Sequence, residues 1–388
     1  MRVLCSTTPM EGVFGPFIPL GRALAAAGHD VIVATGPDLA QRGGDYGLRF
    51  ETAGLSAMDG ARTAFGDPAV QAAPEGDRIA FPAAMFGSII PTAKLPALRR
   101  LAESWRPQLV IHPPVDLAGP LLAEELGVPS ACYGFGQPFD AQTMEAIGAR
   151  VRPLWEQAGL TSRRFGGVYR GDYLDPRPPS LALTPIEVDG SLIPIRPEVP
   201  GDPAATLPDW TASLGPQPCV YLSLGTAPMF NSPDKFKPLL AGLAAAAVDV
   251  IATVSKLHDP TALGELPATV HVEQWLSLAA LLPHCAAVVC HAGTGTVLAA
   301  LASGLPMVLI PQGADQFENA EACRNAGAAR VLIGDAITPA SVAEAIRAVL
   351  ADGSPEAAAA RTIAAEIAAM PTAALAVARL TAPAAIAS

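Results

Sequence analysis

Prolines crowd the stretch between Asp175 and Pro218, and this stretch separates two series of short apolar runs and helix-like segments. Proline fixes φ and removes a backbone donor, so an extended connector is expected here. A chain of 388 residues exceeds what one hydrophobic core usually serves, which favours two domains. The predicted parts are a first domain at 1–200, a proline-rich linker at 201–217, a second domain at 218–370, and a C-terminal helix and tail at 371–388.

The first series alternates apolar strands with helices. The expected strands are 2–7, 30–35, 108–111 and 130–133, and the expected helices are 19–28 and 117–126. The stretch 137–174 is polar and irregular, which is typical of a lid or a pocket wall. Continuous apolar strands that alternate with helices predict a parallel sheet covered on both faces.

The second series predicts another sheet of the same kind. Its expected strands are 220–224, 248–254, 270–273, 287–290 and 307–310, and Thr338 followed by Pro339 is typical of a helix start. The fold class is therefore α/β, with two Rossmann-like, doubly wound parallel-sheet domains and a cleft between them. Open α/β sheets bind their ligands at the carboxyl ends of the strands.

Composition excludes several classes of protein. A formal net charge of −11 argues against a nucleic-acid partner, which would require a basic face. No uniformly apolar stretch is long enough for a membrane span, and the N-terminus predicts a strand and not a signal peptide. The six cysteines form no CxxC motif and are expected to be reduced. We expect a cytoplasmic protein without membrane insertion.

The strongest motif is the run VVCHAGTGT at 288–296, in which a buried strand delivers His291 to its carboxyl end. The glycines that follow allow the backbone to approach a ligand, and a helix then begins. Free N–H groups and the helix dipole make such a turn an anion site, to which His291 adds a side-chain donor. A plain strand-to-helix turn with a core histidine is the alternative for this motif alone.

Two companion motifs favour the anion site. Gly225-Thr226 ends the first strand of the second series, which brings further donors to the same edge. Asp315-Gln316 follows another strand, with Asn319 one helical turn beyond. A carboxylate beside a carboxamide suits the vicinal hydroxyls of a sugar. An exposed helix start is the alternative interpretation of this pair.

With these motifs in place, the run from Trp275 through Gly327 resembles the donor signature of family-one glycosyltransferases with the GT-B fold, in particular the actinobacterial antibiotic and macrolide branch. The resemblance implies an inverting, metal-independent transfer from a nucleoside diphosphate sugar, often a dTDP-deoxysugar, to a small aromatic or polyketide natural-product aglycone. No cofactor beyond this donor substrate is implied. The implied contacts are Gly225, Thr226, His291, Gly293, Thr294, Gly295 and Thr296 to the diphosphate, Asp315 and Gln316 to the sugar, and Trp275 and Leu276 to the base.

The catalytic dyad of these enzymes is not matched. Spacing to Pro16 and Pro19 places Val13 where the family has its catalytic histidine, and Pro113 stands where the orienting aspartate is expected. A valine cannot accept a proton. The implied acceptor pocket is apolar, and its candidate residues are Val13, Phe14, Phe81, Phe86, Phe135 and Phe139.

Three accounts of the missing base remain open. In the first, the acceptor is a phenol-activated aromatic carbon that forms a C-glycoside with help from Asp140, Asp116 or Glu11. In the second, the acceptor is an O- or N-nucleophile that needs little help or uses His112 as its base. In the third, the chain is a non-catalytic nucleotide-sugar binder or a helper subunit. Asp140 leads among the carboxylates, with a solvated loop aspartate as its plain alternative. A nucleotide-sugar epimerase lacks the paired carboxylates it would need, and a dinucleotide oxidoreductase lacks the GxGxxG turn after the first strand. Monomer and homodimer both remain open.

Overall fold

The computed structural model describes residues 1–227, 230–256 and 258–382, and the chain divides into two compact units. The first unit comprises Met1–Pro176, Pro185–Ile195 and the chain from Pro371 onward, and the second comprises Arg177–Thr184 and Arg196–Met370. The segment 201–217, predicted as a linker, belongs to the second unit. The C-terminal helix of the predicted segment 371–388 belongs to the first unit, and 383–388 lie outside the described residues.

The first unit contains a parallel sheet of seven strands in the order β3-β2-β1-β4-β5-β6-β7. The strands are β1 Arg2–Ser6, β2 Asp30–Thr35, β3 Arg49–Thr52, β4 Leu109–His112, β5 Ser130–Tyr133, β6 Asp172–Asp175 and β7 Leu192–Pro194. Four of these strands were predicted to within one residue at each end. The short strands β3, β6 and β7 were not, and β7 lies inside the proline-rich stretch.

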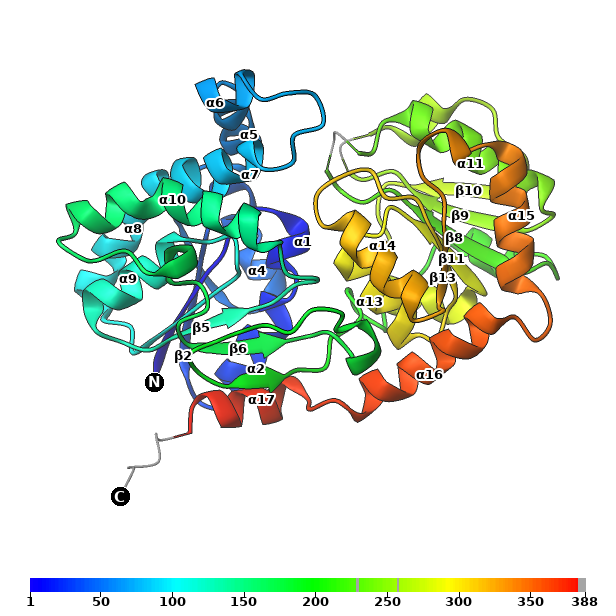
Figure 1. Cartoon of the computed structure of the whole chain (residues 1–388). Coiled ribbons are helices and arrows are strands. Elements are labelled where there is room, and N and C mark those ends of the chain that lie inside the picture. Colours follow the sequence, from blue (N-terminus) through cyan, green and yellow to red (C-terminus); the bar gives the residue numbers. More distant parts are fainter. Residues whose placement is uncertain (228–229, 257, 383–388) are drawn as a thin grey trace. The chain divides into compact units, whose positions relative to one another are not determined.

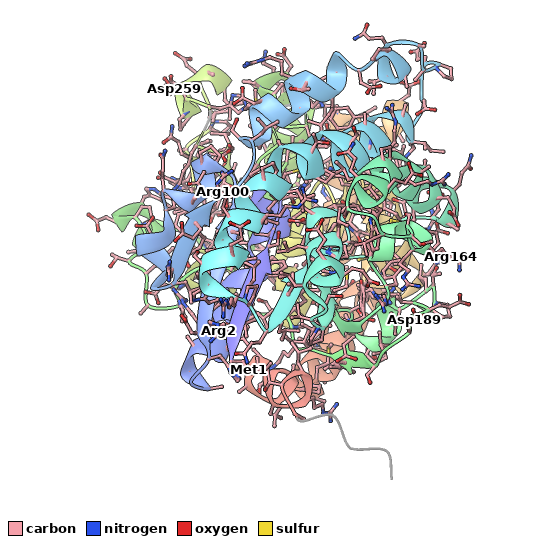
Figure 2. The ribbon with its side chains drawn as sticks, turned by 90° about the vertical axis from the view of Figure 1, so that its left-hand side faces the viewer. Met1, Arg2, Arg100, Arg164, Asp189 and Asp259 are labelled. Atoms are coloured by element: carbon pink, nitrogen blue, oxygen red, sulfur yellow. The ribbon has the colours of Figure 1, made fainter. Side chains whose placement is uncertain are left out.

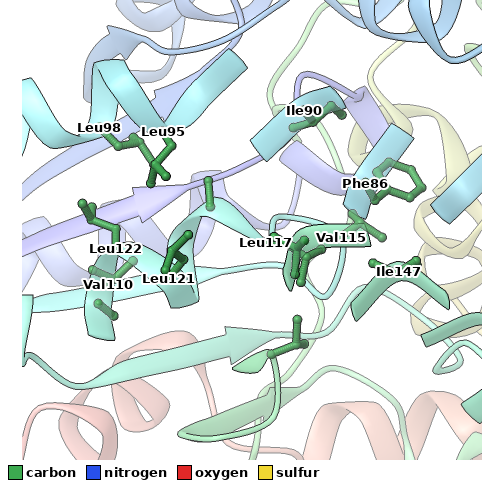
Figure 3. Packing of buried hydrophobic residues seen from close by; sticks show 14 of the residues in the cluster. Phe86, Ile90, Leu95, Leu98, Val110, Val115, Leu117, Leu121, Leu122 and Ile147 are labelled. Atoms are coloured by element: carbon green, nitrogen blue, oxygen red, sulfur yellow. The ribbon is translucent and has the colours of Figure 1, made fainter. Parts of the chain in front are cut away.

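Helices cover both faces of this sheet, as the continuous apolar strands predicted. One face carries α8 (Ile90–Trp105), α9 (Ala118–Leu126) and α10 (Ala141–Gln157), whose residues Leu98, Leu122 and Ile147 belong to the core cluster drawn in Figure 3. The other face carries α2 (Phe17–Ala26) and the C-terminal helix α17 (Ala373–Leu380), which pack side by side (Figure 1).

The shorter helices of the first unit lie in the connections after the strands. They are α1 Glu11–Phe14, α3 Pro37–Ala40, α4 Gly43–Tyr46, α5 Ala57–Phe65, α6 Pro68–Gln71 and α7 Ala80–Ala84, the last joined to α8 by a π-helical turn at Met85–Ile89. The interpretation of 137–174 as an irregular lid is wrong. Asp140 caps the helix α10, and this helix buries Ile147 and Val151 against the sheet.

The second unit contains a parallel sheet of six strands in the order β10-β9-β8-β11-β12-β13. The strands are β8 Cys219–Ser223, β9 Asp249–Thr253, β10 Val270–Glu273, β11 Ala287–Cys290, β12 Met307–Leu309 and β13 Ala329–Val331. The prediction matched β10 and β11 at both ends and missed β13. From β8 the chain order runs outward through β9 and β10 on one side of the sheet, and from β11 through β12 and β13 on the other. The boundary between β8 and β11 is therefore the switch point where such sheets bind ligands.

Helices also cover both faces of the second sheet. The helices α11 (Pro233–Ala245) and α15 (Pro339–Leu350) pack on one face. The helices α13 (Thr294–Ala302), α14 (Gln316–Asn325) and α16 (Pro355–Ala369) contribute to the core cluster on the other, and the single turn α12 spans Leu278–Leu281. Thr338 caps α15 with Pro339 as its first residue, which confirms the predicted helix start.

Charged side chains stand at the surface, for example Arg100, Arg164, Asp189 and Asp259 in Figure 2. Among the described residues, no single helix has the length and apolar character of a membrane span. The bent pair of α16 and α17 reaches that length and composition only when the two helices are taken together.

Candidate functional site

The predicted donor residues lie at one edge of the second sheet. Trp275 follows β10, Gly225 and Thr226 follow β8, His291 follows β11, and Asp315 lies in the loop after β12. Figure 1 labels β8, β10 and β11. All strands are parallel, so their carboxyl ends share this edge. The strand order therefore places the predicted base, diphosphate and sugar contacts in the sequence in which a nucleoside diphosphate sugar carries these groups.

His291 lies between two glycines. A Cβ atom on Gly225 or on Gly293 would overlap Nε2 of the imidazole. Gly225 also has a φ of +82°, a conformation that other residues rarely adopt. Both glycines are therefore required by the position of the ring, and the predicted association of His291 with Gly225 and Gly293 is present in the structure.

Burial lowers the pKa of His291 to about 4, so its ring is neutral at pH 7. Its Nδ1 atom is buried and has no hydrogen-bond partner within the described chain. A neutral imidazole carries one N–H. We assign this hydrogen to Nε2, because an N–H at Nδ1 would be buried without an acceptor. His291 can then donate a hydrogen bond from the side of the two glycines.

The N-terminus of α13 adds backbone donors beside His291. Gly293 occupies the N-cap position, where no side chain caps the helix, and a Cβ atom on Gly295 would point into open space. The N–H of Thr296 donates to the carbonyl of Gly293 at 3.1 Å, whereas the N–H groups before it, at the start of the helix, have no intrahelical acceptor and carry the positive end of the helix dipole. Ala292, directly before this turn, has a φ of +64°, so the chain accepts local strain here.

Thr294 was predicted as a diphosphate contact. Its hydroxyl donates a hydrogen bond to Oδ2 of Asp315 at 2.9 Å. Asn319 donates to the same Oδ2 at 2.8 Å and to Thr294 Oγ1 at 2.9 Å. Asn319 also reaches the carbonyl of Ala292 at 3.1 Å, which ties this network to the glycine-rich turn.

Asp315 and Gln316 are both held by protein groups. Burial raises the pKa of Asp315, and the hydrogen bonds from Asn319 and Thr294 oppose this rise. The side-chain carbonyl of Gln316 accepts from the backbone N–H of Gln312 at 2.8 Å and of Gly313 at 3.2 Å. The residues meet at the loop after β12 as predicted, but part of each side chain is already engaged.

A cavity of about 540 Å³ lies at the ends of β9 and β10. Its lining residues are Lys256, Pro260, Glu273, Gln274 and Trp275. The indole of Trp275 is 54% exposed, and the ammonium group of Lys256 lies 5.4 Å from its ring centroid. A flat base has a platform for stacking here. The side chain of Leu276, the other predicted base contact, is buried in the core and does not face the cavity.

Asn231 was missed by the sequence analysis. Its side-chain amide donates to the carbonyl of Gly225 and, at 3.1 Å, to the carbonyl of Val254. It thereby joins the ends of β8 and β9 between the base cavity and His291. Thr226, next to Gly225, is exposed. No sequence motif marks Asn231, because its partners are backbone atoms brought together only by the fold.

In the first unit, Val13 lies in α1 and is buried in the core cluster that also contains Leu4 and Val110. Pro113 directly follows β4. His112 is completely buried, its Nδ1 lies 3.1 Å from the carbonyl of Pro113, and burial lowers its pKa. A ring so enclosed is poorly placed to take a proton from an acceptor.

The three candidate carboxylates each have a structural partner. Glu11 pairs with Arg42. Asp140 caps α10 by accepting from the backbone N–H and the hydroxyl of Thr143, which lowers its pKa although burial opposes this. This geometry favours the plain interpretation of Asp140.

Asp116 is buried in an ion pair with Lys94, a residue that sequence analysis also missed. Lys94 donates as well to the carbonyl of Thr7 at 2.6 Å, and Ser6 donates to Asp116 at 2.9 Å. Lys94 and Ser6 lower the pKa of Asp116 against the opposing effect of burial. We therefore correct the assignment of Asp116, which is neutralised and inaccessible and so unsuited to act as a base.

The six predicted acceptor-pocket residues divide between two faces of the first sheet. Val13, Phe81, Phe86, Phe135 and Phe139 belong to or pack against the cluster of Figure 3. The prediction that Phe14 belongs to this pocket is corrected, because Phe14 is buried on the opposite face of the sheet. Its ring centroid lies 5.6 Å from that of Tyr46 and 5.7 Å from that of Phe50. Phe135 and Phe139 line a small pocket with Tyr173.

The chain matches a known family along most of its length. Residues 22–225 match the N-terminal domain and residues 237–382 the C-terminal domain described as erythromycin biosynthesis protein CIII-like. L-demethylnoviosyl transferase of Streptomyces niveus is 34% identical over 386 residues, with 96% of this chain and 95% of the relative covered. Elloramycin glycosyltransferase ElmGT of Streptomyces olivaceus is 32% identical over 349 residues, with 84% and 85% covered.

Solved structures give the same result. Glycosyltransferase SnogD from Streptomyces nogalater superimposes with a TM-score of 0.76 at 29% identity, covering 98% of both chains. Spinosyn rhamnosyltransferase SpnG, solved with thymidine diphosphate, gives a TM-score of 0.78 at 27% identity, covering 98% of this chain and 100% of the other.

Proposed function

The chain belongs to the family of actinobacterial antibiotic glycosyltransferases with the GT-B fold, and we propose that it transfers a deoxysugar from a dTDP-sugar to a phenolic natural-product aglycone. The observation that carries the donor assignment is the position of His291 between Gly225 and Gly293, at the N-terminus of α13. The SpnG structure solved with thymidine diphosphate supports dTDP as the nucleotide.

The proposed reaction is a single displacement at the anomeric carbon with inversion. The acceptor forms its bond as the bond between this carbon and the diphosphate breaks, and the electron pair leaves with the diphosphate. The Nε2–H of His291 and the first-turn N–H groups of α13 stabilise the charge that develops there. No metal ion takes part in the proposal.

The acceptor is proposed to be a phenol because the protein side offers no evident base. Val13 holds the position of the family histidine, and Glu11, Asp116 and Asp140 are each engaged by other groups. A phenol ionises readily, and its oxygen or its activated ring carbon is then nucleophilic. This accounts for both an O-glycoside and a C-glycoside. The C–C bond forms when the ring carbon attacks, and the proton of that carbon is then lost to water, which restores the aromatic phenol.

Two measurements test the proposal. A ligand that binds only the native protein raises its thermal midpoint, so dTDP should stabilise the protein more than ADP or CDP. The absence of any stabilisation by dTDP would contradict the donor assignment. Transfer from dTDP-glucose or dTDP-L-rhamnose to simple naphthols and polyhydroxyanthraquinones is then followed by mass spectrometry. Binding of dTDP without transfer to any phenol would favour the helper-subunit interpretation.

The product identifies the bond. An O-glycoside of a phenol hydrolyses in warm acid, whereas a C-glycoside survives. The anomeric proton of a C-glycoside correlates in NMR spectra with an aromatic carbon that bears no oxygen. Either product is consistent with an ionised phenol, while transfer to aliphatic alcohols at a comparable rate would contradict a phenolic acceptor.

A further inference from the structure

We propose that Thr294 is a positioning residue that determines which oxygen of Asp315 faces the donor sugar, so that Asp315 reads one sugar hydroxyl through Oδ1. This inference rests on the proposed use of a dTDP-sugar. In this arrangement the hydroxyl of Thr294 serves Asp315 and not the diphosphate, and Asp315 binds a single hydroxyl instead of a vicinal pair.

The hydrogen bonds around Asp315 carry the argument. The hydroxyl of Thr294 and the amide of Asn319 both donate to Oδ2, at 2.9 Å and 2.8 Å. A carboxylate oxygen accepts about two hydrogen bonds with good geometry. The carboxylate also accepts from the backbone N–H of Asp315. Because the two neighbouring side chains engage Oδ2, we infer that Oδ1 is the oxygen presented to the sugar.

Thr294 and Asn319 also orient one another. Nδ2 of Asn319 lies within hydrogen-bond distance of Asp315 Oδ2, of Thr294 Oγ1 at 2.9 Å and of the carbonyl of Ala292 at 3.1 Å, so its two hydrogens are shared among three acceptors. The hydroxyl of Thr294 donates its one hydrogen to Asp315. Thr294 begins α13, directly after Gly293, and Asp315 precedes α14. The hydroxyl thus connects the predicted diphosphate-binding turn to the predicted sugar-binding loop, and it holds the carboxylate in one rotamer.

Gln316 restricts the sugar contact further. Its Oε1 atom accepts two backbone hydrogen bonds from Gln312 and Gly313, which leaves its NH₂ group as the part able to face a ligand. Asp315 and Gln316 together then present one acceptor and one amide donor. This suits a sugar that offers one hydroxyl hydrogen to Asp315 and a neighbouring oxygen to Gln316.

The test compares Thr294→Val, which keeps the shape of the side chain without its hydroxyl, with Thr294→Ser, which keeps the hydroxyl. Calorimetry measures the affinity of each variant for dTDP and for dTDP-glucose, and turnover assays separate kcat from KM. Thr362→Val is the matched control, because Thr362 is an exposed residue of α16 whose hydroxyl bonds only the carbonyl of Ala358. Thermal midpoints check that all variants are folded.

We expect Thr294→Val to weaken the binding of dTDP-glucose about tenfold while changing the affinity for dTDP less than about twofold. Thr294→Ser should retain the wild-type preference for dTDP-glucose over dTDP. An equal loss of affinity for both ligands would mean that the hydroxyl of Thr294 contacts the diphosphate. No loss of affinity for either ligand would mean that this hydroxyl has no role in donor binding. Both results overturn the proposal.

Donor analogues that lack one sugar hydroxyl test whether Asp315 binds a single hydroxyl. Wild-type protein should lose affinity with whichever of dTDP-3-deoxyglucose and dTDP-4-deoxyglucose lacks the hydroxyl bound by Asp315. Thr294→Val should reduce this loss without changing the response to the other analogue. An equal effect of Thr294→Val on both analogues would contradict the reading of one hydroxyl by Asp315. If the wild-type protein does not bind dTDP at all, the proposed function itself fails, and this outcome is distinguishable because it precedes any comparison of variants.

Discussion

His291 and Gly225 are in contact across two neighbouring strand ends, with the imidazole Nε2 in the space that a Cβ atom of Gly225 would occupy. A Cβ atom on Gly293, two residues after His291, would also overlap this nitrogen. The ring is therefore held by backbone on both sides, and its orientation does not depend on a hydrogen bond to Nδ1. A donor fixed in this way loses little conformational entropy when a phosphate binds.

The first prediction concerns the affinity for dTDP. His291→Ala should weaken binding by roughly tenfold or more, because a hydrogen bond to a charged group contributes about 1.5–3 kcal/mol. His291→Gln should lose less than His291→Asn, since the amide nitrogen of glutamine reaches farther toward the position of Nε2. Calorimetry measures all three, and unchanged affinity in a folded His291→Ala variant would remove His291 from the site.

The second prediction concerns stability against pH. The pKa of His291 falls from 6.5 to about 4 on folding, so between these values the unfolded chain binds a proton that the native protein does not. Stability from this group is therefore present above pH 6.5 and is lost as the pH falls toward 4. Wild type should lose on the order of 2 kcal/mol relative to His291→Gln over this window. Urea unfolding at several pH values measures the difference, and parallel curves would contradict the buried neutral ring.

The third prediction concerns the buried pair of Lys94 and Asp116. Lys94→Met leaves the carboxylate of Asp116 buried without its cation, and such losses cost about 3–5 kcal/mol of unfolding free energy. Adding Asp116→Asn should recover part of this loss, because the amide is neutral and its oxygen, at the position of Oδ1, still accepts from the N–H groups that begin α9. Its NH₂ group, at the position of Oδ2, can donate to the hydroxyl of Ser6. Denaturant titration tests both variants. A full loss that Asp116→Asn does not relieve would show that Lys94 matters for packing alone.

Sequence patterns located the strands that are buried along their whole length. The segment 287–290 was predicted at both ends, because parallel strands covered on two faces form continuous apolar runs. The segment 270–273 was also predicted at both ends, although Val270 is its one buried residue. Strands β3 and β7 escaped detection because they are short and largely exposed. The helix α10 escaped because Pro153 and its charged residues conceal its apolar period.

The site was predictable where it follows local chain geometry. The turn after β11 places His291 beside Gly293 by sequence alone, whereas the hydrogen bond from Thr294 to Asp315 joins loops after two different strands. Neighbours in sequence can also separate, as Val13 and Phe14 do when α1 directs them to opposite core clusters. The engagement of Asp116 by Lys94 likewise depends on a helix that comes from elsewhere in the chain.

The fourth prediction decides whether Asp140 is a cap or a base. Asparagine caps a helix about as well as aspartate, so Asp140→Asn should retain both stability and the rate of transfer. Asp140→Ala should lose about 1 kcal/mol of stability because the N–H of Thr143 loses its partner. Transfer assays with both variants give the answer. A general base contributes about 10²–10⁴-fold in rate, so a loss of that size in Asp140→Asn would make Asp140 the base.

The last prediction concerns the source of the nucleophile. Val13, which the sequence spacing aligns with the family histidine, is buried in the core. We therefore predict that the acceptor loses its proton without that base. The rate of transfer, as kcat/KM, should then rise with pH until the phenol is ionised. Across phenols of different acidity, the midpoint of this rise should move with the pKa of the acceptor. A residue acting as base would instead give one midpoint for every acceptor, because the titrating group would belong to the protein. Naphthols carrying electron-withdrawing groups span the required range, and dTDP affinity measured at the same pH values separates donor binding from the chemical step.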